Sequence, residues 1–276
     1  MTTDRFDPIR RRFRDLHGAD VETFVLPNPW DVGSARILEA MGFVALATTS
    51  SGFAATLGRH DQHVTRDELT AHVAAITAAV ELPVNVDAEN GYAADPAGVA
   101  ETVELLAAAG AAGLSIEDFD PVAGAVTPRP EAIERIEAAA EACHGHGIVL
   151  TARAENHLYG AGDLDDTIGR LLAYRDAGAD AVYAPGLSSV DDIARVVTEV
   201  GLPVNVLALP NGPSVGELAA VGVRRVSTGG ALAWTAYGAL VAGARELLEE
   251  GTSTYATTRR MPGSIRAAAF ADREGA

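Results

Sequence analysis

The chain has 276 residues, of which 48% are hydrophobic, with a formal net charge of −17 and a single cysteine. Length and composition are typical of one large globular α/β domain, and the negative charge argues against nucleic acid or an anionic membrane as a partner. The sequence has no lysine, which excludes Schiff-base aldolases, pyridoxal phosphate enzymes and NTPases that need a Walker A lysine.

Three features predict a cytoplasmic protein. No apolar run approaches the roughly 20 residues that a membrane-spanning helix needs. Residues 1–14 are charged throughout, unlike a signal peptide. One cysteine cannot form an internal disulfide, which suits a reducing compartment.

Eight short apolar runs alternate along the chain with alanine-rich helical stretches, most of which end at a glycine. Continuous apolar runs are typical of parallel strands buried on both faces. The predicted strands are residues 23–27, 44–48, 84–87, 113–117, 148–153, 181–184, 204–207 and 225–228. Eight such units predict a (β/α)8 TIM-type barrel. The alternative is a doubly wound open sheet, although no G-x-G-x-x-G follows the first strand.

No Pro/Gly/Ser-rich linker divides the chain, so we expect a single barrel domain over residues 1–276. The barrel itself is expected at about 20–232, and a C-terminal helical extension at about 233–276. The extension breaks at Met261-Pro262-Gly263 and carries arginines against an acidic body. We expect it to pack on the same barrel or on a partner subunit.

The pentapeptide Leu-Pro-Val-Asn-Val occurs at residues 82–86 and again at 202–206. The two copies are four strands apart in the predicted barrel. A half-barrel repeat would produce such a pair.

The third predicted strand ends in two carboxylates, Asp87 and Glu89. Two acids at the end of a buried strand are costly unless a positive group lies beside them. A hard divalent cation, which prefers oxygen ligands, would serve. The alternative is an ordinary polar strand-to-helix loop that caps a helix.

Other strand ends also carry polar groups, and in a parallel barrel these ends meet at one mouth. The second strand is followed by Thr49, Ser50, Ser51 and Gly52, whose amides suit a carboxylate or phosphate oxygen. Asp61 lies in the next loop.

The fourth strand ends in Glu117 and the fifth in Arg153. Four acids and one arginine around one mouth are electrostatically reasonable with a cation present. Arg153 would bind a substrate carboxylate. Each piece has an alternative: Arg153 could form a structural ion pair with Glu155, and residues 50–52 a plain turn.

Taken in order, five segments resemble the isocitrate lyase and phosphoenolpyruvate mutase superfamily. They are residues 28–36 (N-P-W-D-V-G-S-A-R), 49–52 (T-S-S-G), 87–92 (D-A-E-N-G-Y), 116–118 (I-E-D) and 151–155 (T-A-R-A-E). The resemblance spans roughly residues 25 to 240. It is specific to the superfamily and not to one reaction.

This resemblance implies a Mg2+ or Mn2+ ion, bound directly by Asp87 and through waters by Glu89, Glu117 and Asp61. It implies a small 2-oxo or 2-hydroxy carboxylate substrate and an enolate of pyruvate type. The expected site residues are Arg153, Asp61 and Glu117 for catalysis, Trp30, Thr49, Ser50, Ser51, Gly52 and Arg153 for substrate binding, and Asp87, Glu89 and Glu117 for the metal. It also implies a homo-oligomer, a dimer or tetramer, in which the helix after residue 233 is swapped between subunits.

The chain departs from the lyases of this superfamily in one loop. The lyases carry an acid–base cysteine soon after the fourth strand, whereas residues 118–128 contain no cysteine, lysine or histidine. Cys143 precedes the fifth strand and is expected to be a buried packing residue at the opposite end of the barrel. Isocitrate and methylisocitrate lyase activities are therefore not expected.

Three functions remain at this stage. The first is a Mg2+-dependent enzyme that cleaves or forms a C–C bond next to an enolate, as a lyase or decarboxylase. The second is a phosphonomutase acting on a P–C bond. The third is a barrel that binds a small oxo-acid without turnover.

Overall fold

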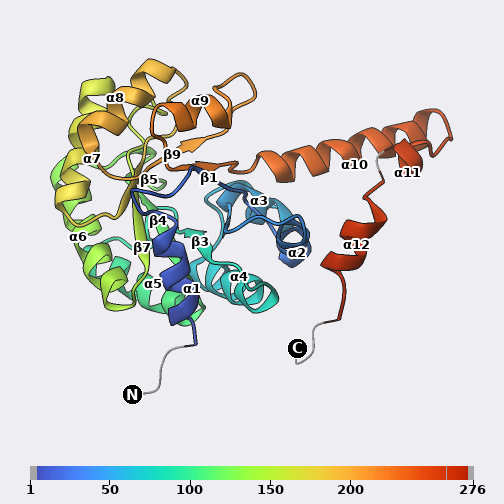
Figure 1. Cartoon of the computed structure of the whole chain (residues 1–276), viewed down its shortest axis with the longest axis horizontal. Helices are drawn as coiled ribbons and strands as arrows, with labels where there is room; N and C mark the ends of the chain where they lie inside the picture. Colours follow the sequence, from blue (N-terminus) through green and yellow to red (C-terminus); the bar gives the residue numbers. More distant parts are fainter. Residues whose placement is uncertain (1–4, 259, 273–276) are drawn as a thin grey trace.

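The computed structural model describes residues 5–258 and 260–272. Eight parallel strands form a nearly closed barrel, in the order β1-β10-β9-β8-β7-β4-β3-β2 (Figure 1). The strands are β1 (Phe24–Leu26), β2 (Leu46–Ala47), β3 (Val84–Asp87), β4 (Gly113–Glu117), β7 (Val149–Arg153), β8 (Ala181–Tyr183), β9 (Val204–Leu207) and β10 (Arg225–Ser227). The predicted strands and the (β/α)8 fold are confirmed.

The barrel closes between β1 and β2 through Asn28 and its neighbours. The amide of Ala47 donates to the carbonyl of Pro27 at 3.0 Å. The Asn28 side chain donates to the carbonyl of Thr48 at 2.7 Å, and its Oδ1 accepts from the amides of Thr228 and Gly229, both at 2.9 Å. One buried side chain thus joins the ends of β1, β2 and β10.

Helices surround the strands, and most begin at a side chain that caps the first turn. Asp31 and Ser34 form a capping box at α2, and Thr49 caps α3. α8 ends at Gly201, whose φ of 71° is the left-handed conformation that favours glycine. These outer helices are α2 (Val32–Ala40), α3 (Ser50–Thr56), α4 (Arg66–Ala79), α5 (Pro96–Ala108), α6 (Arg129–Gly145), α7 (Leu164–Asp176), α8 (Val190–Val200) and α9 (Val215–Ala220).

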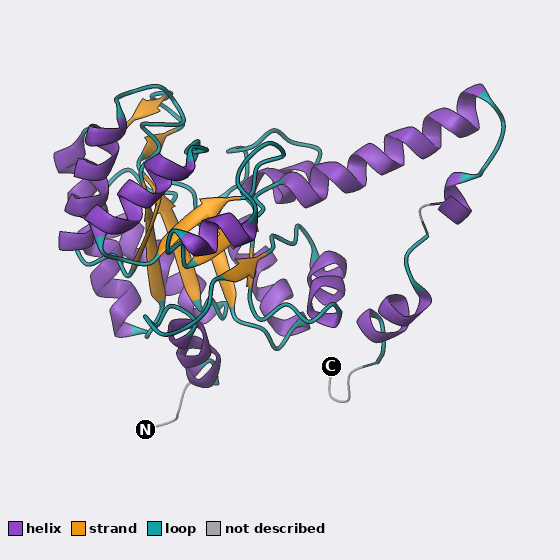
Figure 2. Cartoon of the chain, turned by 45° about the horizontal axis from the view of Figure 1, so that its top comes forward, coloured by secondary structure: helices purple, strands orange, loops and turns teal. Residues whose placement is uncertain are grey.

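The N-terminal helix α1 (Asp7–Asp15) lies across the end of the barrel where the strands begin (Figure 2). Its Phe13 is fully buried and packs with Phe24, Leu26 and Val149. A Cβ added at Gly113, the first residue of β4, would lie 2.3 Å from the Phe13 ring, so only glycine fits there. This end is therefore closed by packed side chains, and the opposite end is the open one.

A small antiparallel hairpin, β5 (Phe119–Asp120) and β6 (Ala125–Val126), follows β4. The sequence did not predict these two strands. The Phe119 ring stacks on that of Tyr159 with centroids 4.1 Å apart, so the hairpin rests on the loop after β7.

The C-terminal helix α10 (Ala231–Glu249) extends away from the barrel (Figures 1 and 2). After it come α11 (Tyr255–Thr258) and α12 (Gly263–Ala269), and α12 returns to contact α2. Arg36 of α2 donates to the carbonyl of Ala271 at 2.5 Å. The tail therefore packs on its own barrel at its far end, while α10 exposes large apolar side chains. Those are Trp234, Leu240, Val241, Leu247 and Leu248.

No helix within the described part of the chain is both long and apolar enough to cross a membrane.

Candidate active site

The open end of the barrel contains a cavity of about 230 Å³. Six of the predicted site residues line it: Thr49, Ser50, Ser51, Asp61, Asp87 and Arg153. Because the strand ends of a parallel barrel meet at one mouth, residues more than 100 positions apart come together there.

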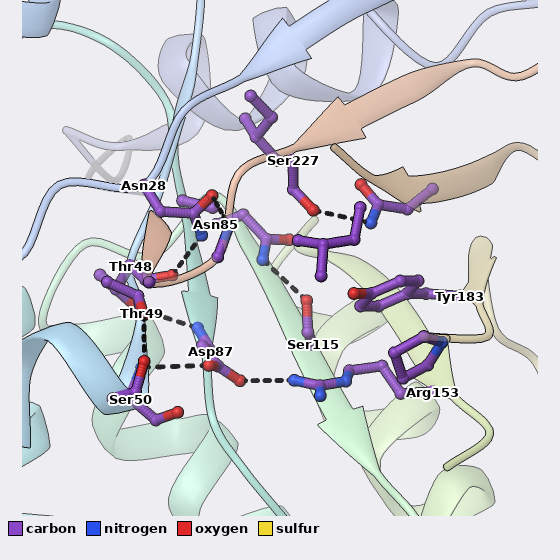
Figure 3. Close-up of a pocket in the computed structure, with 18 of the residues that line it drawn as sticks. Asn28, Thr48, Thr49, Ser50, Asn85, Asp87, Ser115, Arg153, Tyr183 and Ser227 are labelled. Atoms are coloured by element: carbon purple, nitrogen blue, oxygen red, sulfur yellow. Dashed lines mark hydrogen bonds and ion pairs between the residues drawn. The ribbon is translucent and has the colours of Figure 1, made fainter. Parts of the chain in front are cut away.

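Arg153 connects the acids of this mouth, and Figure 3 shows its guanidinium facing Asp87. Its guanidinium binds Asp87 at 2.9 Å, Glu117 at 3.0 Å and Glu155 at 2.9 Å. The side chain is only 16% exposed and also lies over the ring of Tyr183. Two of these contacts are hydrogen bonds, from Nε to Glu155 and from Nη1 to Asp87, and the third is an ion pair. Because arginine has five N–H donors, its terminal nitrogens keep donors for a ligand in the cavity.

Asp87 is held from three directions. Its Oδ1 binds Arg153, its Oδ2 accepts from the amide of Ser50 at 3.1 Å, and its own amide donates to Thr48 Oγ1 at 2.9 Å. These bonds fix the carboxylate at the junction between β3, α3 and Arg153. A group held in this way loses little freedom when it binds a ligand.

The charges at the mouth do not balance. Burial raises the pKa of Glu117 well above its ordinary value even though Arg153 opposes the shift, and burial also raises the pKa of Glu155. Burial alone would lower the pKa of Arg153, but Glu155, Glu117 and Asp87 outweigh it and hold that pKa well above its ordinary value. One cation serves several desolvated acids, so an additional positive charge would be stabilised here.

Asp118, next to Glu117, supports the site from behind. Its Oδ1 accepts from the amide of Glu155 at 2.7 Å, and its Oδ2 from the Tyr174 hydroxyl at 2.5 Å and from Arg170 at 3.1 Å. The carboxylate therefore fixes the loop that carries Glu155. It does not cap a helix.

Glu89 does not line the central cavity but a neighbouring pocket beside the hairpin. Its backbone is left-handed, with φ of 45°, an uncommon conformation for a residue with a Cβ. Its Oε1 accepts from the Tyr92 hydroxyl at 2.7 Å. Burial raises its pKa to about 7, against the opposing effect of the Tyr92 bond.

The segment after β2 presents polar atoms to the cavity. Asp61 is exposed as a residue, yet desolvation of its carboxyl group at the cavity edge raises its pKa, an effect that a hydrogen bond from Ser50 opposes. The amide of Gly52 donates to the capping hydroxyl of Thr49 at 3.3 Å, and the Ser50 amide binds Asp87. The Ser51 hydroxyl lies 3.3 Å from Thr49 Oγ1, and the Ser51 amide has no acceptor among the described residues, so these two groups of the turn are the best placed for a ligand.

Three other predicted residues are absent from the cavity wall. Trp30 lines a separate groove formed with α2 and Leu232. Gly52 lies behind the cavity wall, where an added Cβ would be 3.0 Å from the Trp30 Cβ. Glu117, although absent from the cavity wall, reaches the site through Arg153 and accepts a 3.4 Å hydrogen bond from Gln62.

Cys143 is fully buried in α6. Burial raises the pKa of its thiol well above the ordinary value, so the thiol is neutral and unreactive at pH 7. Its carbonyl accepts from the amide of Ile148, just before β7 begins. The expectation of a packing residue away from the open mouth is confirmed.

Several polar residues deeper in the cavity were not predicted as site residues. Asn85, Ser115, Tyr183, Asn205, Arg225 and Ser227 line the same cavity. The two asparagines are the fourth residues of the repeated pentapeptide, which was the one signal in the sequence that pointed to them.

The oxygen atoms at the mouth are the ligand type that Mg2+ and Mn2+ prefer. Within the described residues, no three Asp, Glu, His or Cys side chains are close enough together to hold one ion. An ion at this mouth would therefore rest on Asp87 and complete its coordination with water and substrate oxygens, as Mg2+ often does. The residues fit such an ion, and the metal remains a prediction.

Comparison with known proteins places this site in a family. The sequence profile of the phosphoenolpyruvate phosphomutase family matches residues 13–248. The chain is 34% identical to an oxaloacetate decarboxylase of a Bradyrhizobium strain over 204 residues, which are 71% of this chain and 70% of the relative.

Solved structures agree. A putative lyase/mutase from Burkholderia cenocepacia J2315 is 47% identical, with a TM-score of 0.91 over 97% of this chain and 98% of the other. A 2,3-dimethylmalate lyase, described as a phosphoenolpyruvate mutase/isocitrate lyase superfamily member, is 27% identical. Its TM-score is 0.82, and the match covers 95% of this chain and 93% of the lyase. The chain belongs to the phosphoenolpyruvate phosphomutase family, within the superfamily that its sequence segments indicated.

Proposed function

We propose that this member of the phosphoenolpyruvate phosphomutase family is a divalent-metal-dependent carbon–carbon lyase that acts on a small 2-oxo dicarboxylate, with oxaloacetate decarboxylation as the type reaction. Membership in a superfamily of lyases and mutases is established by the comparisons. The observation that carries the finer proposal is Arg153, which is held by three carboxylates and lines the cavity.

Arg153 and the Ser51 group would bind the 2-oxo acid end of the substrate. When the C–C bond breaks, negative charge develops on the 2-oxo oxygen, and the fixed N–H donors of Arg153 stabilise it without reorganising. A divalent cation, when bound, would supply further polarisation of that oxygen as a Lewis acid. Asp87 keeps Arg153 in place throughout.

The hairpin favours decarboxylation over a lyase reaction that needs a dedicated acid. Residues 119–128 supply Asp120 and Thr127 but no cysteine, lysine or histidine. Loss of CO2 leaves a carbanion that water can protonate, so no residue of this loop has to donate the proton. The unreactive Cys143 cannot replace the missing group.

The alternative is a phosphonomutase, which the family's description favours. The same arginine and carboxylates would then bind the pyruvate end of phosphonopyruvate. The third reading, a barrel that binds oxo-acids without turnover, uses the same contacts and no chemistry.

One assay separates the three functions. Pyruvate release would be measured with Mg2+ from a panel of oxo- and hydroxy-dicarboxylates and, in parallel, the conversion of phosphonopyruvate. We expect turnover of a four-carbon dicarboxylate that stops when EDTA is added. Because free Mg2+ itself promotes oxaloacetate decay, the Arg153→Ala protein with equal Mg2+ is the control.

Turnover of phosphonopyruvate alone would establish the mutase. Binding of oxo-acids with no turnover of any of them would establish the non-catalytic reading.

A further inference from the structure

The floor of the cavity is a polar layer around Arg225, the first residue of β10. Its Nε donates to Asn205 Oδ1 at 2.9 Å, and its Nη1 lies 3.4 Å from Asn85 Oδ1. Arg225 is 2% exposed, and each asparagine 3% or less. The repeated pentapeptide thus places two asparagines on either side of one buried arginine.

Arg225 has only neutral partners among the described residues. Its third contact is His17 Nε2 at 3.4 Å. Burial, and next the charge of Arg225, lower the pKa of His17 to about 3, so that ring is neutral at pH 7. Burial lowers the pKa of Arg225 to about 9, so the guanidinium still carries its charge. A buried cation without a counterion is unfavourable, so a bound anion would be stabilised beside it.

The asparagines orient the rest of the layer. Because arginine only donates, each amide oxygen must face Arg225, and each amide nitrogen then faces a serine. Asn85 Nδ2 donates to Ser115 Oγ at 2.8 Å, and Asn205 Nδ2 donates to Ser227 Oγ at 2.9 Å; Figure 3 labels Asn85, Ser115 and Ser227. With the serine oxygens accepting, the serine hydroxyl protons are left to donate elsewhere.

The result is a floor that presents donors. The hydroxyls of Ser115 and Ser227 have no acceptor among the described residues, and neither has that of Tyr183, which lines the same cavity. Arg225 supplies the charge. The floor thus has hydrogen-bond donors and a cation but no carboxylate. Such a surface is complementary to an anion and repels a metal ion.

The floor and the mouth belong to one cavity. Asn85 and Asp87 are two residues apart on β3 and face the same interior, so the two levels are about 7 Å apart. That separation matches the extent of a short dicarboxylate with one end at Arg153 and the other at the floor.

We propose that the floor of the cavity, formed by Arg225, Ser115, Ser227 and Tyr183, is a second binding site for a carboxylate-sized anion. Two sources have this chemistry: the second carboxylate of the substrate, which rests on the function proposed above, and a free inorganic anion such as chloride. If the substrate supplies it, the floor binds the carboxylate at the end away from the 2-oxo group.

The test variant is Asn205→Asp, which has the shape of asparagine but gives Arg225 a built-in counterion. Asn211→Asp adds the same charge at an exposed loop position and is the matched control. Calorimetry in the presence of Mg2+ would compare the affinity for acetate with that for succinate. Melting curves would compare the melting temperature in sodium chloride with that in the bulkier sodium isethionate at equal ionic strength. Arg225→Met, which removes the cation, is the second variant.

If the substrate's carboxylate occupies the floor, the preference for succinate over acetate falls by at least about tenfold in Asn205→Asp and in Arg225→Met, as expected for a lost hydrogen bond to a charged group. Asn211→Asp keeps the preference. If a free anion occupies it, chloride raises the melting temperature of the wild type but not of Asn205→Asp, and the succinate preference is unchanged.

The proposal would be overturned by a wild-type protein that shows neither a preference for succinate nor a higher melting temperature in chloride. It would also be overturned by an Asn205→Asp protein that keeps both effects. Because these measurements are of binding, they are separate from the assay of pyruvate release. A protein that released no pyruvate could still bind an anion at its floor, and an active lyase could lack this site.

Discussion

The two arginines in the cavity have opposite surroundings. Arg153 at the mouth contacts three carboxylates at 2.9–3.0 Å, while Arg225 at the floor contacts two amide oxygens and a neutral imidazole at 2.9–3.4 Å. The mouth therefore has more negative charge than its arginine can compensate, and the floor has an uncompensated positive charge. In a low-dielectric interior both imbalances are costly.

The comparison teaches what each end can bind. A cation is stabilised at the mouth and an anion at the floor, so a substrate that carries oxygen anions at both ends would meet a metal and an arginine at one end and an arginine at the other. The polarity of the cavity would then fix which way round the substrate enters.

The largest effect is expected from Arg153→Ala. Removing fixed donors at a developing oxyanion typically costs on the order of 100-fold or more in turnover, and three carboxylates lose their shared partner. Steady-state pyruvate release would measure it, with Arg153→Lys showing whether a point charge suffices. A fully active and folded Arg153→Ala protein would contradict the proposed function.

The next effect concerns the metal. Asp87→Asn should lower Mg2+ affinity by at least about tenfold in calorimetry, because Asp87 ends a strand at the cavity, is fixed there by Arg153 and Ser50, and would contact the ion. Asp120→Asn on the hairpin removes an equal charge outside the cavity and should leave the affinity unchanged. Equal affinities for Asp87→Asn and the wild type would refute the metal assignment.

A smaller effect should appear in the pH dependence of stability. His17 has a pKa of about 3 in the folded protein and about 6.5 in an unfolded chain. Between these values the unfolded state binds a proton that the folded state does not, so the contribution of His17 is fully present above pH 6.5 and is lost as the pH falls toward 3.

Chemical denaturation over that range should give a shallower loss of unfolding free energy for His17→Gln than for the wild type. His63→Gln, at an exposed loop histidine, should keep the wild-type slope. Identical slopes for all three proteins would show that burial and the charge of Arg225 do not lower the pKa of His17.

The smallest effect is expected from Cys143→Ala, which should retain full turnover in the pyruvate assay. Cys143 lies behind the barrel wall, in α6, and its thiol reaches neither level of the cavity. A folded but inactive Cys143→Ala protein would restore the cysteine-dependent lyase chemistry that the loop sequence argues against.

The barrel could be predicted because its strands are buried on both faces and most read as continuous apolar runs, as at Ala181–Tyr183. The hairpin could not. Its strands are two residues each, and its turn depends on the Asp120 side chain, which accepts from the amides of Val122 and Ala123, and on Gly124 with φ of 63°. Such local contacts leave no periodic pattern in a sequence.

Some residues of the site could likewise be predicted from the sequence, and others could not. Asp87, Glu117 and Arg153 could be predicted to meet because each ends a strand, and all strand ends share one mouth. The left-handed backbone that turns Glu89 toward another pocket has no sequence signal. The floor was missed because Arg225 begins its strand, and its position beside both asparagines depends on strand register that only the folded barrel provides.

The projecting helix α10 links folding to protein concentration. Leu240 is 65% exposed and Leu248 86% exposed, and we expect a second copy of the chain to cover this face. Anything that binds only the folded chain stabilises it by mass action, so a self-associating protein is its own stabilising ligand. The melting temperature should therefore rise with protein concentration, and Leu248→Glu should flatten that dependence. A melting temperature independent of concentration, together with a monomer in light scattering, would show that α10 is exposed in solution.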